Sequence, residues 1–386
     1  MGGAAKTVRP QIDPLTGVRG FAATWVVLLH IQLLLPELLP RLPVLGALID
    51  GGNLGVDLFF ILSGFIISFT YLDRLGRGVP GDVPRYLWLR VARIYPAHLF
   101  MLFVVLMMVV VMTVEGTPPA DEQRFSPLSF IMNLFMLQAV PPALAWNDPA
   151  WSISTEFAAY LVFPLLVPLL TRLSPRRAMI ILVVLLLVGT TGLWILVETA
   201  HEWAYWSGYL LMWSRIAVCF PVGCLLYIVW RSRPAEDWSR AAGILLPVAL
   251  IGILAVCVLT PPAEAISLPV AAYPFLVLLI FALASSSGIV SRFLATPPMM
   301  WAGRASYSVY LVHFPLLLVI GAVTTLLGIE GGSTLAWIAL GGTLLAVLGA
   351  GAFVYHLVEE PARRVIRRYV DGRASRRQGE RTPREQ

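Results

Sequence analysis

The sequence predicts an all-α, polytopic membrane protein. Hydrophobic residues make up 58% of the 386 residues and charged residues only 13%, whereas a soluble chain carries about 25% charged residues. Apolar runs of about 17 residues or more, long enough to cross a bilayer as a helix, recur along the chain. The alternating segments of about ten residues that build a transmembrane barrel are absent from the sequence. We therefore expect a bundle of transmembrane helices.

Ten apolar runs meet this length. The spans are expected near residues 15–35, 52–72, 95–114, 151–170, 178–197, 207–230, 242–260, 268–284, 305–328 and 335–357. A shorter run at 126–138, flanked by proline, is typical of an interfacial or re-entrant helix. The expected organisation is a short segment over 1–14, a transmembrane domain over 15–360 and an Arg-rich, disordered tail over 361–386.

The basic residues predict the orientation of the chain. If the N-terminus is cytoplasmic, 24 of the 28 Lys and Arg residues fall in cytoplasmic segments, and the outer loops hold only Arg41 and Arg124. The positive-inside rule then predicts two cytoplasmic termini and an even number of spans. We expect a multi-pass protein of the inner (cytoplasmic) membrane, with the basic tail against anionic lipid. No nucleic-acid partner is expected.

The first span carries two ionisable side chains at membrane depth. Arg19 and His30 are eleven residues apart, which places them about 16 Å apart along a helix and on one face of it. One interpretation is that Arg19 holds an anionic molecule whose reactive end lies at His30. The alternative is structural, with Arg19 extending to the interface and His30 packing with a hydrogen bond.

Two carboxylates lie near the outer ends of spans and are candidate functional residues. Asp57 lies at the outer end of the second span, where an anchoring role is an equally good interpretation. Glu156 lies about five residues inside the outer interface, after Trp151 and Ser152. A carboxylate at this depth needs a cationic or imidazole partner, and His30 is expected at a compatible depth.

Two further pairs share a helix face. Arg90 and Arg93 are three residues apart, at the cytoplasmic mouth beside the third span. Because arginine matches phosphate in geometry and charge, the pair predicts a phosphate site; the alternative is an ordinary positive-inside belt. Tyr310 and His313 lie three residues apart in the ninth span.

The cysteines do not predict a metal site. Cys219, Cys224 and Cys257 are scattered through apolar segments without the His and Cys spacing of a metal centre. Packing is the better interpretation of all three. We expect no metal ion, and the sequence leaves the oligomeric state open.

Five motifs in this order resemble those of the membrane acyltransferase-3 family, whose members O-acylate sugars and secondary metabolites. The resemblance runs from about residue 13 to residue 364. The matching motifs are R-x10-H (Arg19 and His30), GxDxFFxxSGF (55–65), R-x-x-R (Arg90 and Arg93), W-S-x-x-x-E (151–156) and S-x-x-Y-L-x-H (307–313, with Tyr307 where serine is common). The sequence lacks the C-terminal esterase-like domain of larger members, so we expect a single-module enzyme.

The resemblance implies an O-acyltransferase that takes its acyl group from cytoplasmic acyl-CoA. Arg90 and Arg93 would hold the phosphates of CoA, and Arg19 would guide its pantetheine arm or its anionic groups. The thioester would then lie near His30.

The resemblance also implies that His30 performs the chemistry. His30 would act either as a general base on the acceptor hydroxyl or as a carrier of the acyl group. Glu156, or else Asp57, would fix the tautomer of the imidazole. Secondary candidates for the site are Trp151, Ser152, Tyr310 and His313.

The acceptor is expected to be a glycan or a glycosylated small molecule, and the acyl group acetyl or longer. The chief alternative is a transporter or flippase that uses buried Arg, His and Glu as a substrate or proton path. Such a protein is expected to show internal repeats, and the sequence shows no persuasive repeat. A sensor or lipid-binding scaffold, which would bind a ligand without turnover, is a third possibility.

Overall fold

The computed structural model describes residues 12–39, 42–199, 204–260 and 269–379, and these residues form helices and no strand. The predicted all-α, polytopic fold is confirmed. In this part of the chain, nine helices are long and apolar enough to cross a membrane. They are α1 (Asp13–Leu34), α3 (Leu54–Gly76), α4 (Asp82–Val114), α6 (Trp151–Leu170), α7 (Pro175–Glu198), α8 (Ala204–Trp230), α9 (Ser239–Leu259), α12 (Pro297–Leu326) and α13 (Thr334–Val354).

The helix found at the expected eighth span, 268–284, is shorter than predicted. Residue 268 itself lies outside the described residues. Helix α10 (Tyr273–Ser285) has 13 residues, fewer than the roughly 20 that cross a bilayer. Proline lies in its first turn, and the serines at 285–287 follow its apolar part. Ten of its residues are buried in protein, so its apolar character reflects protein packing rather than exposure to lipid.

Shorter elements connect the long helices. The run at 126–138 contains α5 (Pro127–Leu134), whose first turn is capped by Ser126 accepting a hydrogen bond from the Ser129 amide at 3.2 Å. The remaining short elements are α2 (Pro43–Asp50), α11 (Ile289–Leu294), η1 (Pro36–Leu38), η2 (Gly51–Asn53), η3 (Asp148–Ala150), η5 (Ala235–Trp238) and η6 (Val270–Ala272).

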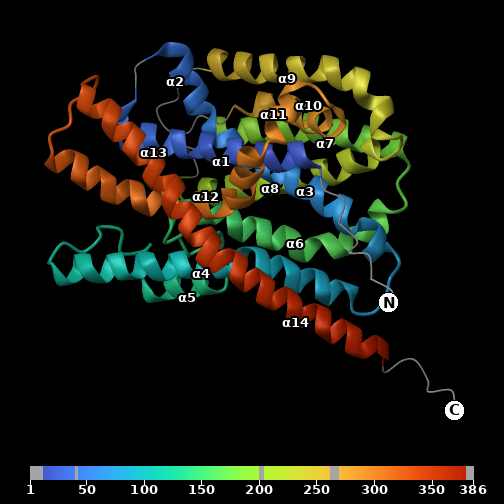
Figure 1. The fold of residues 1–386 in the computed structure, drawn as a ribbon, viewed down its shortest axis with the longest axis horizontal. Helices are drawn as coiled ribbons and strands as arrows, with labels where there is room; N and C mark the ends of the chain where they lie inside the picture. The colour runs from blue at the N-terminus through green and yellow to red at the C-terminus, as the bar shows by residue number, and fades with distance from the viewer. Residues whose placement is uncertain (1–11, 40–41, 200–203, 261–268, 380–386) are drawn as a thin grey trace.

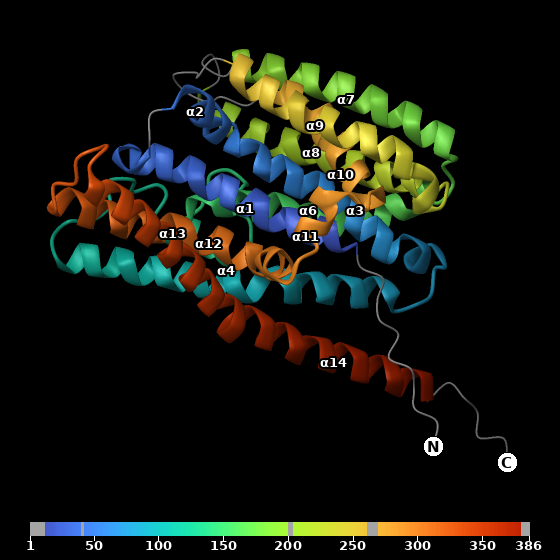
Figure 2. The same ribbon diagram turned by 45° about the horizontal axis from the view of Figure 1, so that its top comes forward.

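The long helices form one bundle. Helices α1, α3 and α12 run through its middle, with α7 and α9 on one side and α4 on the other (Figures 1 and 2). In both views the turns that join α3 to α4, α6 to α7 and α8 to α9 lie at the same end of the bundle. These turns and their flanks carry most of the arginines between residues 74 and 240. We call this the basic end.

Glycines allow the central helices to pack backbone against backbone. A Cβ atom at Gly303 of α12 would lie 1.8 Å from the Thr16 carbonyl oxygen of α1. A Cβ atom at Gly64 of α3 would likewise lie 2.0 Å from the Phe220 carbonyl oxygen of α8. Such close approach is typical of helices packed within membranes. The contact at Gly303 fixes α1, and with it Arg19 and His30, against α12.

In place of the disordered tail expected over 361–386, helix α14 (Glu360–Gly379) follows the five-residue π-helical segment η7 (Tyr355–Glu359). Glu360 pairs with Arg363 and, at 2.8 Å, with Arg364, so opposite charges alternate at helical spacing. Asp371 pairs with Arg85 of α4. The prediction of disorder rested on the number of charged residues and did not consider their helical spacing. Residues 380–386, like residues 1–11, lie outside the described residues.

Candidate active site

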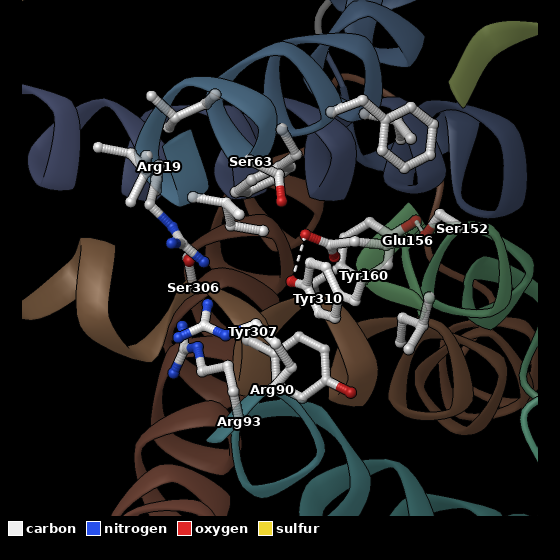
Figure 3. A pocket seen from close by; sticks show the side chains of 17 residues that line it. Arg19, Ser63, Arg90, Arg93, Ser152, Glu156, Tyr160, Ser306, Tyr307 and Tyr310 are labelled. Carbon is white, nitrogen blue, oxygen red and sulfur yellow. Dashed lines mark hydrogen bonds between the residues drawn. The ribbon is translucent and has the colours of Figure 1, made fainter. Parts of the chain in front are cut away.

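A cavity lies between α1, α3, α4, α6 and α12. It encloses about 700 Å³, including the part open to its surroundings, which is a typical size for a small-molecule site. Its polar lining brings together motifs that are distant in the sequence (Figure 3): Arg19, Ser63, Arg90, Arg93, Ser152, Glu156, Tyr160, Ser306, Tyr307 and Tyr310.

Three guanidinium groups lie on one side of this cavity (Figure 3). Arg19 comes from α1, and Arg90 and Arg93 come from α4 near the basic end. The Nε atoms of Arg19 and Arg90 are buried and have no hydrogen-bond partner among the described residues. Arg90 donates to the Tyr71 hydroxyl at 3.1 Å and lies over that ring at 5.1 Å. Buried cations with unused donors form a site suited to an anion.

The side chain of Glu156 points into this cavity and is not directed at His30. Its Oε1 atom accepts a hydrogen bond from Tyr160, one turn later on α6, at 2.6 Å. Among the described residues, no hydrogen bond or ion pair joins Glu156 to His30. The expected pairing is therefore not formed, because matching depth along the membrane does not specify which way a helix face is turned.

Asp57 is bound to a different partner. Arg215 of α8 donates to it twice, from Nε at 2.9 Å and from Nη2 at 3.0 Å. Asp57 is fully buried, and Trp151 covers the Arg215 guanidinium at 5.1 Å. The carboxylate therefore links α3 to α8 and does not orient His30, which corrects that expectation.

His30 lies beside a second histidine, His313. Their ring centroids are 4.8 Å apart, and the rings are steeply inclined at 68°. Nδ1 of His30 lies 2.8 Å from the Val26 carbonyl oxygen, and Nδ1 of His313 lies 2.6 Å from the Tyr310 carbonyl oxygen. A carbonyl can only accept, so each Nδ1 carries a proton and each Nε2 is the basic nitrogen. Nε2 of His313 is buried and unpaired within the described part of the chain.

Tyr310 connects the histidines with the cavity. Its side chain lines the cavity, and its ring centroid is 5.7 Å from that of His313. Its hydroxyl lies 2.8 Å from Ser152 Oγ and donates to the Pro149 carbonyl at 2.9 Å. The secondary candidates Ser152, Tyr310 and His313 thus form one continuous region between the cavity and His30.

Sequence reasoning missed Tyr160 and Glu359. Tyr160 follows Glu156 at helical spacing, which is a signal that could have identified it. Glu359 borders the Arg-rich run that was expected to form a disordered tail, so no pattern in the sequence marked it as a buried residue. Glu359 is fully buried and binds Arg93.

Comparison with known proteins defines the class. A family model described as an acyltransferase domain matches residues 12–355. The chain therefore belongs to this acyltransferase family, as its motifs predicted, and its multi-pass helical fold is that of a membrane protein. No solved structure matches the chain.

Three relatives illustrate the range of the family. Acyltransferase MdmB of Streptomyces mycarofaciens is 26% identical over 379 residues, 93% of each chain. O-acetyltransferase OatA of Staphylococcus aureus is 24% identical over 341 residues, 82% of this chain and 52% of the relative. Putative peptidoglycan O-acetyltransferase YrhL of Bacillus subtilis is 23% identical over 381 residues, 91% of this chain and 55% of the relative. The chain spans about half the length of OatA and YrhL.

Proposed function

We propose that this protein transfers an acyl group from cytoplasmic acyl-CoA to a hydroxyl of a carbohydrate-containing acceptor. The observation that carries the proposal is the cluster of Arg19, Arg90 and Arg93 in one cavity, with two buried and unused Nε donors. The phosphate groups of CoA are ligands of the right chemistry for such a cluster. The pantetheine arm of acyl-CoA would extend from the arginines past Tyr310, and would place the acyl group near His30.

The orientation follows from the charges of the connecting turns. Although α10 is short, the chain returns to the basic end between α9 and α12, because α12 begins beside the first turns of α1, with Gly303 against Thr16. We therefore place the basic end, both termini and the arginine-lined side of the cavity on the cytoplasmic side of the inner membrane, because basic segments are retained there. Acyl-CoA made in the cytoplasm would then reach the arginines directly. His30 lies about 16 Å further along α1 than Arg19, towards the opposite end of the bundle.

His30 is the proposed catalytic residue, through Nε2. As a general base, Nε2 takes the proton of the acceptor hydroxyl while that oxygen attacks the thioester carbonyl; the C–S bond breaks, and the CoA thiolate receives the proton. As an acyl carrier, Nε2 itself attacks the thioester and the C–S bond breaks to release the CoA thiolate; the acceptor oxygen then attacks the acyl group, the N–C bond to the imidazole breaks, and the hydroxyl proton passes to the thiolate. Both routes use the tautomer that the Val26 carbonyl fixes.

The acceptor class is inferred from relatives. OatA and YrhL are named as O-acetyltransferases, and YrhL as a putative peptidoglycan O-acetyltransferase. We infer a glycan or a glycosylated small molecule as acceptor and an acetyl or longer acyl group. Membership of an acyltransferase family favours acyl transfer over the alternative of a transporter or flippase. The buried Arg, His and Glu side chains are the only observation that still supports transport.

The test is turnover by the purified protein in liposomes, followed as CoA release with a panel of glycan acceptors. Arg90→Gln is expected to raise the KM for acyl-CoA about tenfold or more and to change kcat less, because it removes a ground-state contact to phosphate. Arg304→Gln, which alters an exposed arginine of α12, is the matched control. Absence of both acyl-CoA binding and CoA release from the wild type would reject the proposal and favour transport.

A further inference from the structure

Glu359 is a fully buried carboxylate at the end of η7. Both of its oxygen atoms accept hydrogen bonds: Oε1 from Arg93 Nη1, and Oε2 from Ser308 Oγ at 2.7 Å. A buried carboxylate is stable only when it is paired and hydrogen-bonded in this way. The proposed reaction makes no use of Glu359.

Arg93 is held differently from the two other arginines of the cavity. Besides the ion pair with Glu359, its guanidinium lies 5.7 Å from the centroid of the Tyr307 ring, and the Tyr307 hydroxyl is itself fixed by the Ile94 carbonyl at 2.6 Å. In the described part of the chain, neither Arg19 nor Arg90 has a carboxylate within ion-pair distance. Arg93 therefore enters the cavity in one fixed orientation.

The backbone around Glu359 reinforces this arrangement. The π-helical segment η7 separates α13 from α14, and π-helical turns occur frequently at functional sites. Beyond it, Asp371 of α14 binds Arg85 of α4. Arg85 and Arg93 are eight residues apart, about 12 Å along α4, so the C-terminal segment contacts the arginine-bearing helix at two points.

We propose that Glu359 is the positioning residue of the anion site. One carboxylate oxygen fixes Nη1 of Arg93, which directs the remaining N–H groups of that arginine into the cavity. Its negative charge also offsets the repulsion among three cations that share one cavity. The inference rests on the proposed function only in naming CoA as the anion.

The test measures equilibrium binding of CoA and, separately, of inorganic pyrophosphate to purified full-length protein. Glu359→Gln keeps the size of the side chain and removes its charge. We expect it to raise the Kd for both probes about tenfold, and to raise the KM for acyl-CoA while kcat changes less than about threefold. Glu360→Gln is the control, because the adjacent carboxylate binds only Arg363 and Arg364 among the described residues.

A double-mutant cycle separates positioning from a general effect on folding. If Glu359 acts through Arg93, the double variant Glu359→Gln/Arg93→Gln binds no more weakly than Arg93→Gln alone. Additive losses, an unchanged Kd or a lower Kd in Glu359→Gln would overturn the proposal. If Glu359→Gln does not fold, Ser308→Ala keeps the ion pair but removes the second contact, and a smaller rise in Kd is then required.

The two probes distinguish failure of this inference from failure of the proposed function. Wild-type binding of pyrophosphate without binding of CoA would leave the anion site and its positioning residue in place and reject the donor. Wild-type binding of neither probe would reject both. Binding of both probes that is insensitive to Glu359→Gln would reject only the positioning role.

Discussion

Asp57, Glu156 and Glu359 show how far residue-level reasoning reaches. Sequence reasoning identified Asp57 and Glu156 as candidates; depth in the membrane suggested His30 as the partner of Glu156, and the family resemblance offered His30 as the alternative partner of Asp57. The actual partners are Arg215, Tyr160 and Arg93, respectively. Partner choice depends on how each helix is rotated about its axis, and contacts between helices from distant parts of the chain set that rotation. The identity of the site residues was therefore more predictable than their pairing.

The Asp57–Arg215 pair is expected to support stability, not chemistry. Removing one member, as in Asp57→Asn or Arg215→Met, leaves a buried group without its counter-charge and is expected to cost about 3 kcal/mol. Thermal unfolding in detergent should show this loss, while the folded fraction keeps its turnover per molecule. The double variant is expected to lose less than the sum of the single variants. A folded Asp57→Asn that has lost turnover would instead return Asp57 to the catalytic site.

At the level of elements, helix packing explains both the successes and the errors of prediction. Hydrophobic runs located the long helices because lipid and protein interiors both require apolar side chains. The same signal overestimated α10, which is apolar because protein surrounds it. Helix α14 was missed because its stability comes from ion pairs along the helix and to α4, which composition does not reveal.

The contact between α1 and α12 is expected to control the site. Gly303→Val would place side-chain atoms against the Thr16 carbonyl and push α1 away from α12. We predict a fall of about tenfold or more in kcat/KM, with a lower unfolding temperature, because Arg19 and His30 move with α1. Gly342→Val is the control, since a Cβ atom there meets no atom within 4 Å. Equal activity in the two variants would contradict the account.

At the level of the whole molecule, the fold collects five separated motifs around one cavity. The cavity has arginines from α1 and α4 near the basic end, and Tyr310 connects it to the histidine pair. The sequence predicted which motifs belong together through their resemblance to a family. It could not predict that Glu359 completes the arginine cluster, because that contact joins residues 266 positions apart.

The proposed orientation can be tested on intact cells. Arg77, in the turn between α3 and α4, and Glu330, between α12 and α13, are both exposed and lie outside the cavity. A membrane-impermeant maleimide is expected to label Glu330→Cys from outside and Arg77→Cys only after the cells are opened. The three native cysteines are buried and provide the background control. Labelling of Arg77→Cys in intact cells would contradict the proposed orientation and show that the basic end faces outward.

The most direct test of the central claim is to measure acyl-CoA binding and CoA release on the same preparation of His30→Ala. The account predicts binding with the wild-type Kd, because the arginines are untouched, and CoA release reduced at least about a hundredfold. His356→Ala, which removes an exposed histidine stacked on Trp301, is the matched control and should behave as wild type. Undiminished CoA release by His30→Ala would contradict the account.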